Sequence, residues 1–122
     1  EIRARFDEQA NIMWTEKLQE EGVRVIQNIP GFKVHAKLLL IRRKEKGENI
    51  YYANISTGNF NESTAKLYSD DSLLTCDQGL CQDVNNVFHL FESKYIPPTF
   101  NELQVAPFKL RPFFQKMILD MR

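Results

Sequence analysis

The sequence predicts an α/β fold in which helices flank a mixed β-sheet. Apolar residues recur at helical spacing near both ends of the chain. Two runs with strand character lie in the middle, separated by a charged stretch that contains a glycine. The 122 residues are enough for one small domain. Hydrophobic residues make up 43% of the chain and charged residues 26%, which is typical of a globular protein rather than a disordered one.

The first part of the chain predicts a helix followed by a short strand. Ala10, Trp14 and Leu18 stand at positions i, i+4 and i+8, a spacing that places their side chains on one helix face. Gly22 is suited to end this helix, because glycine adopts the left-handed conformation that closes many helices. Residues 23–26 contain two valines and an isoleucine, and this composition predicts a short strand.

The middle of the chain predicts a β-hairpin and one further strand. Residues 32–42 carry apolar side chains on both faces, as an interior strand does when both faces of its sheet are covered. The charged residues 43–49 predict the hairpin loop, and residues 50–56 predict the returning strand. Residues 61–67 predict a short helix or coil, and residues 73–75 another strand.

The last part of the chain predicts two helices joined by an extended linker. The first begins at Asp83, carries an apolar stripe, and must end before Pro97-Pro98. Residues 100–107 predict the linker, and residues 113–121 predict the second helix. That helix has no predicted strand to pack against, so we expect it to belong to a following module.

Charge and cysteine content narrow the possible partners and the location. Lys+Arg and Asp+Glu both count 16, so no overall field favours nucleic acid, and no nucleic-acid partner is expected. No apolar run approaches the roughly 20 residues of a membrane span. Cys76 and Cys81 are too few for a disulfide framework and predict reduced thiols. We therefore expect a cytoplasmic protein, with peripheral contact at the inner membrane face left open.

A His-x-Lys segment carries the first suggestion of chemistry. Residues two apart on a strand point the same way, so Lys33, His35 and Lys37 are predicted to share one face. Lysines bind phosphoryl oxygens, and a neutral imidazole can attack phosphorus. Taken alone, a histidine in a buried strand is more often a hydrogen-bonded core residue, so this segment does not by itself define a site.

The segment Thr57-Gly58-Asn59-Phe60-Asn61 favours a functional site over a core histidine. Its glycine permits a tight turn, and Asn59 and Asn61 supply amide donors. A hairpin that folds within residues 44–49 brings this segment back towards the start of the first strand, close to His35. Two polar clusters at the same end of adjacent apolar strands predict a functional site.

The chain resembles the polyphosphate kinase family, in its bacterial type with a phosphohistidine intermediate. The ordered motifs that carry the resemblance are Ala4-Arg5-Phe6-Asp7-Glu8, Pro30-Gly31, Val34-His35-Ala36-Lys37-Leu38, Thr57-Gly58-Asn59-Phe60-Asn61-Glu62, Thr64-Ala65-Lys66-Leu67-Tyr68 and Ser72-Leu73-Leu74-Thr75. The catalytic core of this family consists of two phospholipase D-like modules. The resemblance implies that residues 1–98 are most of the first module. Residues 99–122 are then a linker and the start of the second, in a truncated internal fragment.

The resemblance also implies roles for individual residues. His35 would accept the terminal phosphoryl group of ATP and pass it to polyphosphate, and Tyr68 would contact the nucleotide. Arg5 matches a position that the family associates with magnesium. A guanidinium group has only donors, so we expect Arg5 to contact phosphate beside the metal. To these we add Lys37 and Asn59 as electrostatic stabilisers of the transferred group.

The implied partners are ATP, ADP and inorganic polyphosphate, with Mg²⁺ as cofactor. We expect the complete protein to be a homo-oligomer. The second module is expected to complete the site, so that the fragment alone is inactive. The alternative is a phospholipase D-like phosphodiesterase or nuclease, but the pattern of those enzymes has an aspartate where this chain has Arg42. A non-catalytic polyanion-binding module would need a basic stripe, which the balanced charge disfavours.

Overall fold

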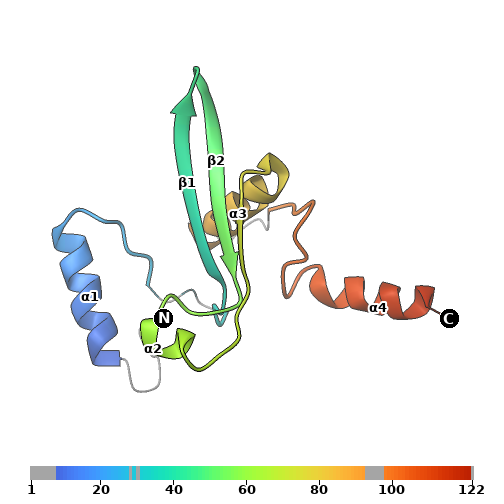
Figure 1. Cartoon of the computed structure of the whole chain (residues 1–122), viewed down its shortest axis with the longest axis horizontal. Coiled ribbons are helices and arrows are strands. Elements are labelled where there is room, and N and C mark those ends of the chain that lie inside the picture. The colour runs from blue at the N-terminus through green and yellow to red at the C-terminus, as the bar shows by residue number, and fades with distance from the viewer. Residues whose placement is uncertain (1–7, 28, 30, 93–97, 122) are drawn as a thin grey trace. The chain divides into compact units, whose positions relative to one another are not determined.

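The computed structural model describes residues 8–27, 29, 31–92 and 98–121 (Figure 1). The chain divides into two compact units, residues 1–35 and residues 36–122, and each is described by itself. Every helix in the described ranges falls short of the length and apolar content that a membrane span requires. In chain order, the elements are α1 (Glu8–Glu20), β1 (Lys37–Glu45), β2 (Glu48–Ser56), α2 (Glu62–Ala65), β3 (Ser72–Thr75), α3 (Gln78–Glu92) and α4 (Leu110–Asp120).

Helix α1 forms in the first unit where the apolar spacing predicts it. It ends at Gly22, which has φ 77°. The N–H groups of Gly22 and Val23 donate to the carbonyl oxygens of Gln19 and Leu18 at 3.0 and 2.9 Å. This pair of bonds is a Schellman motif, which satisfies carbonyls at the helix end. The prediction that Gly22 ends the helix is therefore confirmed.

The strand predicted for residues 23–26 is not formed. These residues have no regular secondary structure, and the side chains of Val23 and Ile26 are 47% and 42% exposed. A strand needs a neighbour to satisfy its backbone groups, and the described residues of the first unit contain no other strand. The β-branched composition of residues 23–26 was therefore not enough to form a strand without a neighbouring strand.

Strands β1, β2 and β3 form a sheet in that order, and both pairings are antiparallel. The predicted hairpin is confirmed, but the loop predicted for residues 43–49 is wrong. Only Lys46 and Gly47 form the turn, with φ 50° and 91°, as in a two-residue type I′ turn. This turn matches the strand twist, so residues 43–45 continue the pairing of backbone groups to the tip.

The start of β1 also differs from the prediction. The strand begins at Lys37, and residues 32–36 have no regular structure, although the apolar pattern predicted a strand from residue 32. Lys37 pairs with Ser56, which is the last residue of β2. Beyond this pair β2 offers no further backbone groups to residues 32–36.

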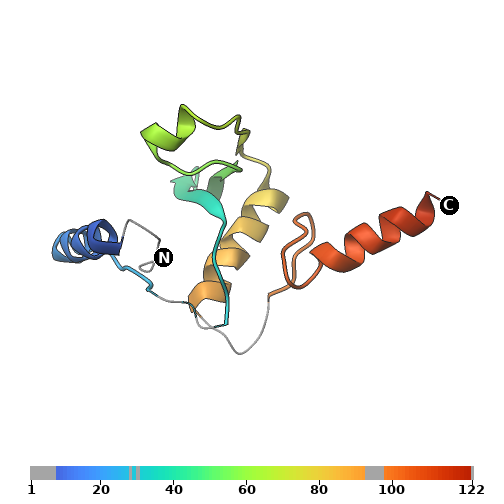
Figure 2. The same cartoon turned by 90° about the horizontal axis from the view of Figure 1, so that it is seen from below.

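Helix α3 covers one face of the sheet, as Figures 1 and 2 both show. Cys81 and Val84 are fully buried against Ala53. The partly buried residues packed around this core are Leu38, Leu40, Tyr51, Ile55 and Leu103. The helix begins before the predicted Asp83, because Asp77 caps it. The Asp77 carboxylate oxygen Oδ1 accepts the N–H of Leu80 at 2.9 Å.

The opposite face of the sheet is largely open. Leu39, Ile41 and Leu74 are 46%, 48% and 80% exposed. Register places Asn54 between Leu39 and Leu74 on this face. Asn54 is buried, its amide nitrogen donates to Ser72 Oγ at 2.6 Å, and its oxygen Oδ1 has no hydrogen-bond partner. The two-sided apolar pattern of β1 is thus matched by packing on only one face within the described part of the second unit.

The stretch predicted as a linker is in part held against α3. Phe100 is 1% exposed and stacks on Phe108 with ring centroids 6.3 Å apart. Helix α4 begins at Leu110, before the predicted residue 113, because Pro112 is tolerated in a first helical turn. None of its residues is buried. The division into residues 1–98 and 99–122 stays a prediction.

Candidate functional site

The predicted site end of the sheet is defined by the pair Lys37 and Ser56. Lys37 is the first residue of β1 and Ser56 the last of β2, and the two are register partners. The turn that starts at Thr57 therefore begins opposite the first residue of β1. The predicted return of residues 57–61 to the start of the first strand is correct, although the hairpin folds at a shorter turn than predicted.

His35 lies just before this pair, in the segment without regular structure. The prediction that Lys33, His35 and Lys37 share one strand face is wrong, because only Lys37 belongs to β1. The alternative interpretation, a core histidine, is also wrong, since the His35 side chain is exposed. His35 ends the first unit and Lys37 lies in the second, and Ala36 joins them. Lys37 itself is half-buried.

Reciprocal hydrogen bonds hold the start of the 57–61 turn. The N–H of Thr57 donates to the Asp71 carbonyl at 3.0 Å, and the N–H of Asp71 donates to Thr57 Oγ1 at 3.0 Å. The Thr57 hydroxyl also lies 3.2 Å from Asp70 Oδ1. The N–H of Gly58 donates to Ser56 Oγ at 3.1 Å. The turn is therefore fixed to the segment that leads into β3.

Gly58 is required at this turn because of a close approach. A Cβ atom added to this residue would lie 2.8 Å from Asp70 Cβ, with the Asp70 carboxyl group nearer still. Real Cβ atoms do not approach other heavy atoms so closely. The sequence predicted a glycine that permits a tight turn, and the structure shows that the limiting factor is the neighbouring side chain.

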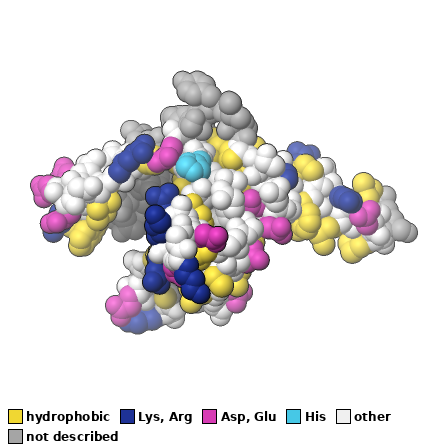
Figure 3. All heavy atoms as spheres, turned by 90° about the horizontal axis from the view of Figure 1, so that it is seen from above, with side chains coloured by type: hydrophobic (Ala, Val, Ile, Leu, Met, Phe, Trp, Pro, Cys, Tyr) yellow, Lys and Arg dark blue, Asp and Glu magenta, His cyan; other side chains and the backbone are white. Residues whose placement is uncertain are grey.

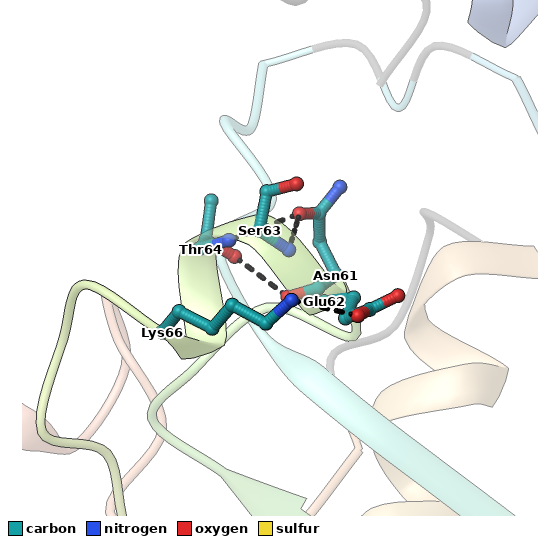
Figure 4. A network of polar contacts seen from close by, with 5 residues as sticks. All are labelled: Asn61, Glu62, Ser63, Thr64 and Lys66. Atoms are coloured by element: carbon teal, nitrogen blue, oxygen red, sulfur yellow. Dashed lines mark hydrogen bonds and ion pairs between the residues drawn. The ribbon is translucent and has the colours of Figure 1, made fainter.

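Asn61 caps α2 (Figure 4). Its side-chain oxygen Oδ1 accepts the N–H groups of Ser63 and Thr64 at 3.0 and 3.1 Å. The side-chain oxygen of Asn61 is thus used as an acceptor within the chain. The amide nitrogen is the group that fits the predicted role of Asn61 as a donor. Lys66 and Glu62 form an ion pair at 2.8 Å, but both side chains are exposed and the pair adds only about 0.3–0.5 kcal/mol.

The remaining predicted residues of this loop face solvent. Asn59 is exposed, and its carbonyl accepts the N–H of Asn61 at 2.8 Å. Tyr68 is 68% exposed and follows α2, where its N–H donates to the Thr64 carbonyl at 3.2 Å. The structure therefore places Lys37 and Asn59 near one end of the sheet, with Tyr68 on the segment beyond α2. Arg5 lies outside the described residues.

Charged residues elsewhere on the hairpin give no single-sign surface. Figure 3 looks onto the hairpin tip, where Lys and Arg side chains are interspersed with acidic ones. Arg43 Nε, for example, lies 3.5 Å from Glu45 Oε1. Arg42 is exposed on β1 at the position where a phospholipase D-like nuclease would carry an aspartate. In the described ranges, no group of three or more His, Cys, Asp or Glu side chains is placed to hold a metal ion.

Asp70 and Asp71 are the residues of this region that sequence reasoning missed. They follow Tyr68 and Ser69 and directly precede β3. The available signal was β3 itself, because an antiparallel strand after β2 must bring the residues before it alongside the end of β2. The register confirms this, since Ser72 pairs with Ser56.

Helix α3 packed on an antiparallel sheet, with a His-x-Lys segment leading into the first strand, defines an α/β domain. The family described as Polyphosphate kinase C-terminal domain 1 matches residues 1–97. The polyphosphate kinase of Escherichia coli (strain K12) is 52% identical over 118 residues, which are 97% of this chain and 17% of that protein. The chain therefore belongs to the polyphosphate kinase family.

Two further comparisons agree with this assignment. The polyphosphate kinase of Vibrio cholerae serotype O1 is 52% identical over 107 residues, which are 88% of this chain and 15% of that protein. The crystal structure of polyphosphate kinase from Porphyromonas gingivalis matches with a TM-score of 0.79 and 37% identity, over 96% of this chain and 20% of that chain. The predicted α/β, phospholipase D-like fold is confirmed by this match, but the sheet in the described residues is antiparallel and not mixed as predicted. The chain spans about a sixth of the length of the relatives it matches.

Proposed function

We propose that this chain is part of an ATP–polyphosphate phosphotransferase in which His35 is the nucleophile. The observation that carries the proposal is the register between β1 and β2. It sets Lys37, two residues after His35, opposite the end of β2, where the Thr57-Gly58-Asn59 turn begins. A cation and a turn rich in polar groups then stand at the end of the sheet to which the histidine segment is tethered.

The proposed reaction has two balanced steps. A nitrogen of neutral His35 attacks the γ-phosphorus of ATP, the P–N bond forms, and the bond from that phosphorus to the β–γ bridging oxygen breaks as ADP leaves. A terminal phosphate oxygen of polyphosphate then attacks the phosphorus, and the P–N bond breaks. Polyphosphate is longer by one unit, and His35 is neutral again.

The other residues of the site stabilise charge and bind the nucleotide. Lys37 places an ammonium group beside the transferred phosphoryl group, and the Asn59 amide donates to its oxygens. The exposed Tyr68 ring offers a face and a hydroxyl to the nucleotide. Arg5 binds phosphate. When bound, Mg²⁺ would neutralise phosphate charge beside Arg5, with phosphate oxygens and water as its ligands.

The histidine assignment is tested by labelling. The complete polypeptide that carries this chain is incubated with γ-labelled ATP, and acid-labile, alkali-stable label is measured on the protein. We expect His35→Ala to abolish the label. His89→Ala is the matched control, because His89 is the other histidine of the sequence and is exposed on α3, where its Nδ1 lies 3.7 Å from Glu92 Oε2. Label that persists in His35→Ala, or that disappears in His89→Ala, would contradict the assignment.

The dependence on a second module is tested separately. We propose that groups from outside these 122 residues complete the acid–base chemistry, so the isolated chain should not lengthen polyphosphate. Pure isolated chain is assayed for ATP-dependent synthesis, with the complete polypeptide as the positive control. Synthesis by the isolated chain at a rate within tenfold of the complete polypeptide would refute this part of the proposal.

A further inference from the structure

Asp83 on α3 is a buried carboxylate outside the phosphoryl-transfer site. Its side chain is 1% exposed, and one oxygen, Oδ2, accepts three backbone N–H groups. These belong to Asn101, Glu102 and Leu103, at 2.8, 2.7 and 2.8 Å. Three consecutive amides around one anionic oxygen form a nest, a geometry that backbone adopts around anions. An ionised acceptor also makes each bond stronger than a neutral one would.

Further contacts hold the same segment to α3. The Asn86 amide nitrogen donates to the Thr99 carbonyl at 3.0 Å, and the Lys109 ammonium group donates to the Phe100 carbonyl. Phe100 is 1% exposed, and Leu103 packs against the core of the sheet and α3. We call the contacts that Asp83 and Asn86 make with residues 99–103 the α3 clasp.

The α3 clasp crosses a boundary in the chain. The match to polyphosphate kinase C-terminal domain 1 ends at residue 97, whereas the segment that Asp83 holds comes after it. Burial of a carboxylate costs free energy unless the group is paired, so we expect Asp83 to have a compensating role. The role that its hydrogen bonds support is to fix the direction of the chain as it leaves α3.

We propose that Asp83 is a positioning residue. It fixes the exit of the chain from the first catalytic domain and thereby aligns the groups that follow with the phosphoryl-transfer site. The structural half of this inference stands on the hydrogen bonds alone, and the kinetic half rests on the proposed function. Because the proposed ATP contacts precede residue 97, loss of alignment slows transfer without weakening ATP binding.

The structural half is tested by amide hydrogen exchange in the complete polypeptide. We expect residues 101–103 to exchange at least tenfold faster in Asp83→Ala and by an intermediate factor in Asp83→Asn, which keeps an acceptor but loses the charge. Asp77→Ala is the control, because it removes a cap on the same helix and leaves the clasp intact. Its 101–103 amides should exchange within twofold of the parent. Unchanged exchange in Asp83→Ala would overturn the inference.

The kinetic half is tested by steady-state transfer from ATP to polyphosphate. We expect Asp83→Ala to lower kcat at least tenfold with KM for ATP within twofold, Asp83→Asn to recover part of the loss, and Asp77→Ala to change neither. An unchanged kcat together with fast exchange would show that the clasp does not align the site. If Asp83→Ala unfolds the domain, the β1–β2 amides also exchange quickly. Asn86→Ala, which removes the hydrogen bond to Thr99, is then the variant that tests the clasp. If the parent transfers no phosphate, the proposed function fails while the exchange result still stands.

Discussion

Replacement of Gly58 by alanine tests how tightly the 57–61 turn is built. The new Cβ would lie 2.8 Å from Asp70 Cβ. The Asp70 carboxyl group is exposed and can rotate away, but its Cβ moves only if the backbone moves. Such a shift would strain the Thr57 N–H to Asp71 carbonyl bond of 3.0 Å. Overpacking of this kind costs about 1–3 kcal/mol, so we expect a loss of about 2 kcal/mol.

The loss is measured by urea unfolding followed by far-ultraviolet circular dichroism. With a slope of about 1.5 kcal/mol per molar urea, a loss of 2 kcal/mol lowers the unfolding midpoint by roughly 1.3 M. Gly79→Ala is the matched control. Its new Cβ would meet Asp77 Oδ1 and Glu102 Cγ at 3.2 and 3.3 Å, a milder contact than at Gly58. Alanine also favours a helix, so the midpoint should change by only a few tenths of a molar.

A double mutant isolates the cause. Asp70→Gly removes both the carboxyl group and the Cβ that the new alanine would meet. In that background Gly58→Ala should cost less than about 0.5 kcal/mol, because two sites in contact are not additive. An equal loss in both backgrounds would refute the argument from close approach.

Further predictions concern the two thiols, the hairpin turn and the cap of α2. Burial raises the pKa of the Cys81 thiol, so iodoacetamide at pH 8 should modify the exposed Cys76 at least tenfold faster, as read by mass spectrometry. The same shift makes the contribution of Cys81 to stability fully present below its unfolded-state pKa and lost as pH rises through the higher folded pKa. In the hairpin turn, Lys46→Asn should raise the melting temperature slightly, because asparagine adopts a positive φ more readily than lysine. Gly47 has φ 91°, so Gly47→Ala should lower the free energy of unfolding by about 1 kcal/mol. Both changes are measured by thermal unfolding. Asn61→Ala should cost about 0.5–1 kcal/mol in local stability, seen as faster exchange of the two amides that it caps.

Each of these has a contrary outcome. Equal alkylation of the two thiols in the folded protein would mean that Cys81 is not shielded. A melting temperature that falls in Lys46→Asn, or that holds in Gly47→Ala, would contradict the turn geometry. Unchanged exchange at the capped amides would show that α2 does not depend on the asparagine.

The hairpin and its site end were predictable because antiparallel pairing is simple geometry. Once two strands are joined by a short connection, the residues after the second must return to the start of the first. Turn length was not predictable in the same way. Residues 43–45 are charged and suit a loop, yet exposed strand positions accept them equally well, and the turn at Lys46 and Gly47 decides between the two.

The histidine segment shows a different limit. Its motif order pointed to the family and to His35, and the structure agrees that Lys37 lies at the predicted end of the sheet. The prediction of a shared strand face was wrong because it assumed that apolar alternation continues as a strand. In the structure, strand pairing stops at Ser56. Alternation reports which residues can form a strand, but a neighbouring strand determines how many do.

Contacts between segments far apart in the sequence were the least predictable. The sequence predicts Asp83 as the start of a helix, and nothing near it indicates that its carboxylate holds residues 101–103. The pairing of Asp70 and Asp71 with the Thr57 turn likewise depends on the register of β3. Both contacts are made by aspartates, which local sequence patterns assign to helix caps and turns.

The β1–β2 hairpin also determines where this protein tolerates a change in length. Its register has nine residue pairs, and eight steps separate the tip pair Glu45 and Glu48 from the pair Lys37 and Ser56, a separation of about 26 Å at 3.3 Å per step. A peptide tag or reporter inserted between Lys46 and Gly47 would therefore lie far from the site end of the sheet, where Lys37 and Ser56 pair. A single residue inserted within either strand would instead turn every later side chain to the opposite face. Insertions into this chain should accordingly use the tip and leave the two strands unaltered.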